Sequence, residues 1–223
     1  MNPVGLAYER YRVGPFDEWM MRIGAADAPP VLFVPPLFEE MNRTRALIAA
    51  MMRALAVRGF GCWLPDLPGT GESERALEAV SWDDWRHGVT QATVAAGSGR
   101  PLLVASLRGG ALLDDAAEGA GYWRLSPADG ASLVRDMERS GLAGGADWAG
   151  YAPSAGLRTK LAEVKPGPVS PLRVVRLESD RGEADAKLEG PALWRRSEPG
   201  TSPSLAGAAA ADLEEWARTC GVC

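Results

Sequence analysis

The chain contains very little histidine and cysteine. His87 is the only histidine among 223 residues. Because histidine is the side chain most often used as a general base near neutral pH, few histidine-dependent mechanisms are open to this chain. Three cysteines, Cys62, Cys220 and Cys223, form an odd set that suits a reducing compartment better than a disulfide framework. The Cys220/Cys223 spacing lacks the second ligand pair of a zinc site, and we expect a cytoplasmic protein.

Long apolar runs and clusters of basic residues are also missing. No stretch approaches the roughly 18 apolar residues of a membrane span, and the first residues do not read as a signal or transit peptide. The 24 Lys and Arg residues are scattered and stand against 29 Asp and Glu, which gives a net charge of -5. We therefore expect no membrane span and no nucleic-acid partner, while the oligomeric state is left open.

What the chain does have is material for one globular core, with 46% hydrophobic and 24% charged residues. Short apolar runs alternate with helical patterns, which predicts an α/β fold with a mostly parallel sheet flanked by helices. The predicted strands are 6–13 and 18–23, forming an initial antiparallel hairpin, then 31–34, 59–64, 102–105 and 172–177. The predicted helices are 42–58, 81–96, a helix from Gly109, 125–140, 154–164 and 208–219. We expect a single domain over 1–223, with a small helical insertion at 122–150 that could form a lid.

The loops that follow three of these strands carry most of the chemical information. They are 35–42, 66–73 with the pattern D-x-x-G-x-G-x-S, and Ser106-Leu107-Arg108-Gly109-Gly110. In a parallel sheet, ligands bind beyond the carboxyl ends of the strands, so these loops are expected to form the site. Gly69-Thr70-Gly71 lacks the lysine of a phosphate-binding loop, and neither a cofactor motif nor a metal-ligand cluster is found.

Together these loops resemble those of α/β-hydrolases, in order and separation, over residues 30–118 at least. More narrowly, the whole chain is similar to the second group of hydrolases encoded beside exosortase A and exopolysaccharide genes. The segments that carry this resemblance are 35–45, 106–113, 150–154 and 190–194. The resemblance implies an α/β-hydrolase-like fold and a hydrolase acting on an ester or acyl group in an exosortase- or exopolysaccharide-associated pathway.

The residues of a serine-hydrolase mechanism are not recognisable in this chain. Aligning Gly110 with the last glycine of G-x-S-x-G places Arg108 at the nucleophile position, and a guanidinium that stays protonated cannot attack a carbonyl. No histidine follows residue 87. Asp180 stands where the acidic member would fall, although an aspartate in a turn after a strand is the simpler interpretation. Ser106 is an offset candidate nucleophile that has no neighbouring base.

Arg108 is then the most informative residue, and two interpretations remain open. Its guanidinium could bind the carboxylate or phosphate of a ligand, or it could pair with Glu39 or Glu40 and fill the site. The candidate catalytic residues are thus Ser106, Arg108 and Asp180, and the candidate pocket residues are Leu37, Glu39, Glu40, Leu107 and Gly109. The alternative to a hydrolase is an inactive pseudo-hydrolase that binds a small anionic or acyl-bearing molecule, or a protein partner.

Overall fold

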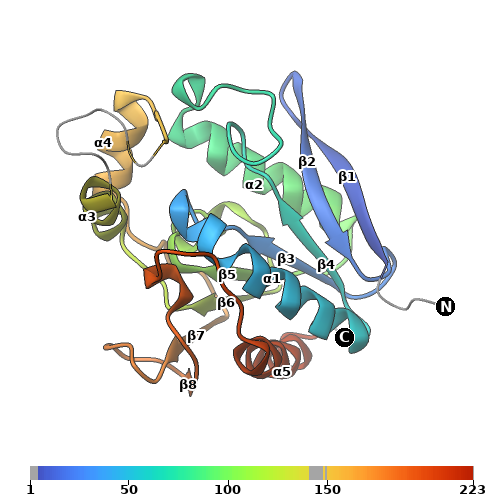
Figure 1. The fold of residues 1–223 in the computed structure, drawn as a ribbon. Helices are drawn as coiled ribbons and strands as arrows, with labels where there is room; N and C mark the ends of the chain where they lie inside the picture. Colours follow the sequence, from blue (N-terminus) through green and yellow to red (C-terminus); the bar gives the residue numbers. More distant parts are fainter. Residues whose placement is uncertain (1–4, 141–147, 149, 223) are drawn as a thin grey trace.

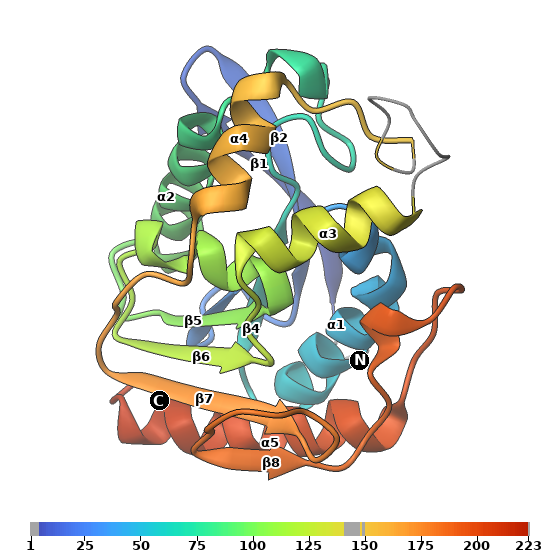
Figure 2. The same cartoon turned by 90° about the vertical axis from the view of Figure 1, so that its left-hand side faces the viewer.

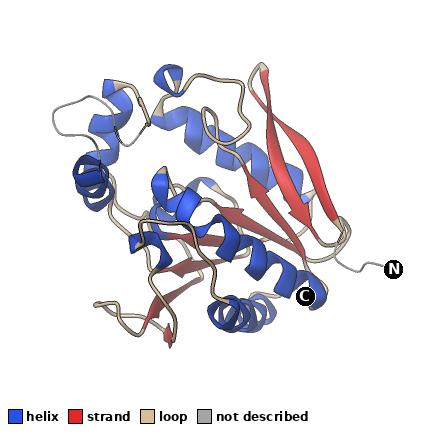
Figure 3. Ribbon diagram, in the orientation of Figure 1, coloured by secondary structure: helices blue, strands red, loops and turns tan. Residues whose placement is uncertain are grey.

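One eight-stranded sheet forms the centre of the molecule in a computed structural model that describes residues 5–140, 148 and 150–222 (Figures 1 and 3). The strand order is β1-β2-β4-β3-β5-β6-β7-β8; β1 and β2 pair antiparallel, β2 pairs antiparallel with β4, and the other neighbours are parallel. The strands are β1 (Leu6–Val13), β2 (Phe16–Ile23), β3 (Pro30–Val34), β4 (Gly61–Pro65), β5 (Leu103–Leu107), β6 (Gly121–Leu125), β7 (Leu172–Leu177) and β8 (Ala186–Leu188). The predicted mostly parallel sheet with an antiparallel start is confirmed.

Helices cover both faces of this sheet, as Figure 2 shows for α5 on one side and α2 and α4 on the other. The α-helices are α1 (Glu39–Val57), α2 (Trp82–Gly97), α3 (Gly130–Ser140), α4 (Ala155–Glu163) and α5 (Pro203–Thr219). Every residue of β3, β4, β5 and β6 is buried, because both faces of these central strands are shielded. Two cores result: one lies between the sheet and α1 and α5, and the other lies beneath α2, α3 and α4.

Two helix starts show how local sequence sets the boundaries. Ser81 and Asp84 form a capping box at the start of α2, in which each side chain accepts a backbone N–H of the other residue. The helix predicted over 42–58 begins three residues earlier, at Glu39. Asn42 is already inside the helix, and its amide donates to Glu39 Oε1 at 3.1 Å and to the Tyr151 hydroxyl at 2.8 Å.

The second half of the chain needs the larger corrections. Residues 121–125 form β6 between β5 and β7, a strand that was not predicted, and the helix predicted over 125–140 begins only at Gly130. The helix predicted from Gly109 is a short 3₁₀ helix, η2 (Arg108–Leu112). The three-residue strand β8 was not predicted, since so short a run leaves no periodicity to detect. Part of the predicted lid, 141–147 and 149, lies outside the described residues, and the lid stays a prediction. Within the described residues, no helix is long and apolar enough to cross a membrane.

Candidate functional site

The loops at the carboxyl ends of β3, β5 and β6 carry strained backbone. Phe38 (φ 54°), Arg108 (φ 51°) and Ser126 (φ 47°) each follow one of these strands. Among the described residues, Ser98, at the end of α2, is the one other non-glycine residue with positive φ. Such backbone costs about 1–3 kcal/mol per residue and persists where surrounding structure enforces it, often at functional sites. The cluster of strained residues therefore marks this end of the sheet as the candidate site.

The turn after β5 has the shape of a nucleophile elbow with arginine at its apex. Arg108 directly follows the buried strand and begins η2. Gly110 lies so close to β3 that a Cβ atom there would stand 2.4 Å from the Val34 carbonyl oxygen. A side chain at this position would force the turn away from β3, so the sharp elbow depends on glycine.

Arg108 pairs with Glu40, a contact that one of the two interpretations of this residue predicts. Arg108 Nε lies 2.9 Å from Glu40 Oε1, and Gly109 N–H donates to Glu40 Oε2 at 3.4 Å. Glu40 is buried, and burial raises the pKa of its carboxyl group, although the Arg108 charge and hydrogen bond act to lower it. The Glu40 carboxylate thus accepts the backbone N–H of Gly109, the residue that follows Arg108 at the elbow.

A second set of contacts joins Arg108 to the ends of β6, β7 and β8. Its Nη1 donates to the Ser126 carbonyl oxygen at 3.2 Å, and the Ser126 hydroxyl donates to Asp180 Oδ2. Asp180 is buried just after β7 and also lies 3.7 Å from Arg195. The Arg108 guanidinium stacks 5.0 Å above the ring of Trp194, which follows β8. Ser126 therefore links Asp180 to Arg108, because it is hydrogen-bonded to both residues.

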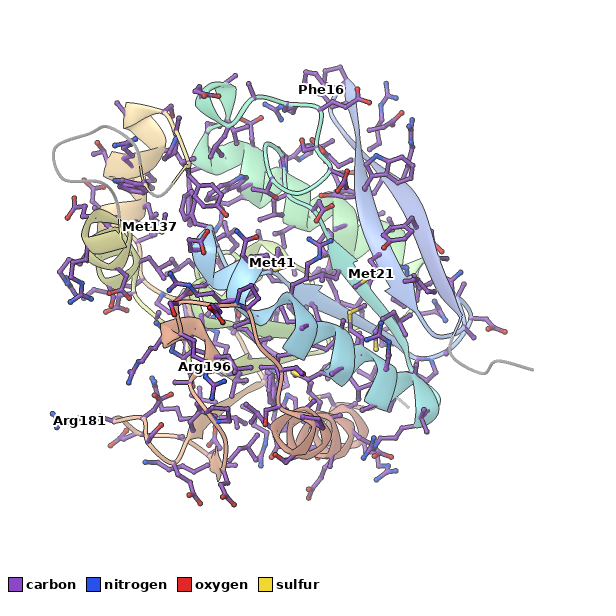
Figure 4. The ribbon with its side chains drawn as sticks, viewed as in Figure 1. Phe16, Met21, Met41, Met137, Arg181 and Arg196 are labelled. Atoms are coloured by element: carbon purple, nitrogen blue, oxygen red, sulfur yellow. The ribbon has the colours of Figure 1, made fainter. Side chains whose placement is uncertain are left out.

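A pocket of about 280 Å³ opens beside this network, between the start of α1, α3 and the segment after β8. Its apolar wall includes Met137, which α3 carries and Figure 4 labels. Its polar groups are three guanidinium groups and three carboxylates. The lining residues are Leu37, Phe38, Glu39, Glu40, Arg43, Leu133, Asp136, Met137, Arg139, Trp194 and Arg195.

Of the predicted pocket residues, Leu37, Glu39 and Glu40 lie in this lining, and Gly109 contacts it through Glu40. Leu107 is fully buried in the core beneath α1 and α5. His87 is exposed on α2. No group of three or more His, Cys, Asp or Glu side chains in the described part of the chain could hold a metal ion.

Ser106 belongs to a separate buried centre. Its hydroxyl donates to Asp114 Oδ2 at 2.8 Å, and Arg124 binds both oxygens of Asp114, at 2.8 and 2.7 Å. Ser106 and Asp114 are both fully buried. Burial raises the pKa of Asp114, while the Arg124 hydrogen bonds and charge act to lower it. The structure therefore separates Ser106 from Arg108 and Asp180, although the three were predicted together.

The sequence-based reasoning missed Ser126, Trp194, Arg195 and Arg43 as members of the site. Trp194 ends one of the segments that carried the family resemblance, but nothing in its local pattern showed that it faces Arg108. Ser126 was hidden because β6 was not predicted, so its place at a strand end could not be seen. Arg43 lies one helical turn after Glu39, a spacing that does put both on one face of α1.

Comparison with solved structures gives the fold. No protein-family model and no curated protein matches this chain. Similar structures include mouse alpha/beta hydrolase domain-containing protein 10 (12% identity, 96% of this chain and 99% of that chain, TM-score 0.64). Est1E from Butyrivibrio proteoclasticus, solved with ferulic acid, is similar at 14% identity (95% and 99% covered, TM-score 0.63). The thioesterase domain from the curacin biosynthetic pathway is similar at 14% identity (95% and 99% covered, TM-score 0.56).

These likenesses, with the strand order and the elbow after β5, define an α/β-hydrolase-fold protein. At sequence identities this low, the structural similarity establishes the fold and leaves the activity open. In this chain the elbow carries Arg108, paired with an internal carboxylate.

Proposed function

We propose that this chain is a non-hydrolytic α/β-hydrolase-fold protein that binds a small anionic or acyl-bearing molecule in the pocket beside the elbow. The observation that carries the proposal is the Arg108–Glu40 pair, which occupies both the nucleophile position and the adjacent Gly109 amide. A serine-hydrolase mechanism needs that position for a nucleophile and that amide for a developing oxyanion. A pocket with an apolar wall and several polar groups is retained beside the pair.

The competing function is a hydrolase acting on an ester or acyl group, which the sequence resemblance implies. Asp180 favours it, because this buried carboxylate follows β7, where the acidic member of such a site would stand. The placement in an exosortase- or exopolysaccharide-associated pathway, and the alternative of a protein partner, stay predictions that rest on the sequence alone.

The two functions are separated by measuring turnover and binding on the same protein. With p-nitrophenyl butyrate, we expect no turnover above an Arg108→Ala control, and with a fluorophosphonate probe no stoichiometric labelling of Ser106. Ligand-observed NMR is expected to show saturable binding of acetophenone, an acyl compound, or of benzoate, an anion. Turnover that disappears in Arg108→Ala, or stoichiometric labelling of Ser106, would establish the hydrolase instead. Failure of both small molecules to bind would contradict the binding function.

A further inference from the structure

Two buried N–H donors beside the pocket have no hydrogen-bond partner. Among the described residues, the buried side-chain donors without a partner are Arg43 Nε and Trp194 Nε1, and both residues line the pocket. Trp194 is 3% exposed. Arg43 Nε lies 3.6 Å from Glu39 Oε2, which is an ion-pair distance beyond hydrogen-bond length. Buried donors are almost always satisfied in native proteins, so two orphaned donors at one pocket call for an acceptor.

The two residues that carry these donors contact each other. Arg43 Nη1 donates to the Trp194 carbonyl oxygen at 3.1 Å, and the Arg108 guanidinium lies 5.0 Å from the centre of the Trp194 ring. A carbonyl oxygen has two lone pairs, so one such oxygen could accept from both donors. The apolar wall, with Leu37, Leu133 and Met137, would surround the rest of a small ligand.

The charges around the pocket argue against an anion as that acceptor. Each guanidinium in the lining already has a carboxylate within ion-pair distance: Arg43 with Glu39, Arg195 with Asp180, and Arg139 with Asp136. The third lining carboxylate, Glu40, pairs with Arg108. A carboxylate ligand would add one negative charge to guanidinium and carboxylate groups that already pair with one another. It would lose its hydration, and no unpaired guanidinium would be there to replace it. A neutral acceptor satisfies the donors without this cost.

We infer that the ligand of this pocket is an uncharged carbonyl compound, such as a small ketone, ester or amide, whose oxygen accepts hydrogen bonds from Trp194 Nε1 and Arg43 Nε. This inference rests on the proposed binding function and narrows it from anionic or acyl-bearing ligands to neutral acyl compounds. Trp194 and Arg43 then determine specificity, and Arg108 holds the Trp194 ring in place.

Three probes of similar shape test the choice of acceptor: acetophenone is a neutral carbonyl compound, benzoate is an anion, and isopropylbenzene has no acceptor. We expect acetophenone to bind at least tenfold more tightly than either of the others. Trp194→Phe removes the N–H and keeps an aromatic ring beneath Arg108, and it should raise the Kd of acetophenone about tenfold, the effect of one lost hydrogen bond. Arg43→Lys, which keeps the charge but removes Nε, should act in the same direction.

Trp216→Phe is the matched control, because the Trp216 indole N–H is already bound to the Tyr122 carbonyl oxygen and lies outside the pocket lining. Its Kd for acetophenone should equal that of the wild type. Tighter binding of benzoate than of acetophenone, or an unchanged Kd in Trp194→Phe, would overturn this inference while the binding function stands. If neither acetophenone nor benzoate binds to the wild type, both the inference and the proposed binding function fail.

Discussion

Two arginine–carboxylate centres touch the end of β5, and they differ in how completely their carboxylates are satisfied. Asp114 accepts three hydrogen bonds of 2.7–2.8 Å, from Ser106 and from both sides of the Arg124 fork. Glu40 accepts one bond of 2.9 Å from Arg108 and a longer one of 3.4 Å from Gly109, and it borders an open pocket. A saturated, sealed network braces a fold, whereas a loosely bound carboxylate beside a pocket is where a ligand can act. Asp114 thus belongs to the structural core, whereas Glu40 borders the proposed ligand pocket.

The largest expected effect is at the sealed centre. Asp114→Ala leaves the Arg124 guanidinium buried without its partner, and we expect a loss of about 3–5 kcal/mol in the free energy of unfolding. Urea denaturation measures it. Asp115→Ala is the control, because Asp115 pairs with the partly exposed Arg86, where a change of about 0–1 kcal/mol is expected. Equal losses in the two variants would show that the Asp114 centre is not the brace described above.

A smaller loss is expected at the elbow. Arg108→Met removes the partner of Glu40, but this carboxylate keeps the Gly109 N–H and lines the pocket, so we expect a loss of about 1–3 kcal/mol in the free energy of unfolding. The double variant Glu40→Leu/Arg108→Met removes both charges and should recover most of that loss. Urea denaturation of wild type and both variants tests this. A double variant less stable than Arg108→Met would mean that the pair contributes to stability as the Asp114 centre does.

The pH dependence of stability gives the next contrast. Burial raises the pKa of Glu40 above its ordinary 4.5, so Glu40 takes up its proton at a higher pH in the folded state than in the unfolded state. Its contribution to stability is therefore greatest below that ordinary value and is lost as the pH rises through the raised folded pKa. Glu40→Gln lacks this titration. As the pH falls toward 4.5, the wild type should gain stability relative to Glu40→Gln, as thermal unfolding across pH would show. A constant difference would contradict this.

Asp212 on α5 should change stability with pH in the opposite direction. Burial acts to raise the pKa of Asp212, but hydrogen bonds from Arg173 and Trp123 outweigh it, and the pKa is lowered from its ordinary 3.8. Its contribution is present above that value and is lost as the pH falls through the lowered folded pKa. Below about pH 4, the wild type should therefore lose stability relative to Asp212→Asn. Thermal unfolding across the same pH series measures both effects. If the stability differences from Glu40→Gln and from Asp212→Asn changed in the same direction with pH, the contrast would be refuted.

The smallest expected effect is on catalysis. Arg108→Ser places a hydroxyl at the elbow, but His87 is exposed on α2 and no other histidine exists to activate it. Hydrolysis of p-nitrophenyl butyrate by Arg108→Ser should therefore stay at the level of Arg108→Ala. A clear gain over Arg108→Ala would mean that another group at the site serves as a base.

The fold could be predicted well from the sequence in its first half and less well in its second. The strands β3, β4 and β5 are buried on both faces and are separated by the helices α1 and α2, the second of which is capped by Ser81, so local pattern and fold agree. β6 contains Arg124 as the fourth of its five residues, and that charge is tolerated because Asp114, at the start of η3 (Asp114–Ala116), pairs with it. A strand whose burial depends on a distant partner has no local signature.

The sequence by itself determined that arginine precedes Gly109-Gly110 and that no histidine follows His87 in it, and these two facts predict the loss of the usual serine-hydrolase chemistry. It left open whether Arg108 meets a ligand, Glu39 or Glu40. Only the tertiary structure decided this. Consecutive residues on a helix point about 100° apart, so when α1 packs beside β5, one of the two carboxylates faces the elbow and the other faces Arg43. Which one does so depends on how the helix is rotated against the sheet, and that is set by packing across the whole core.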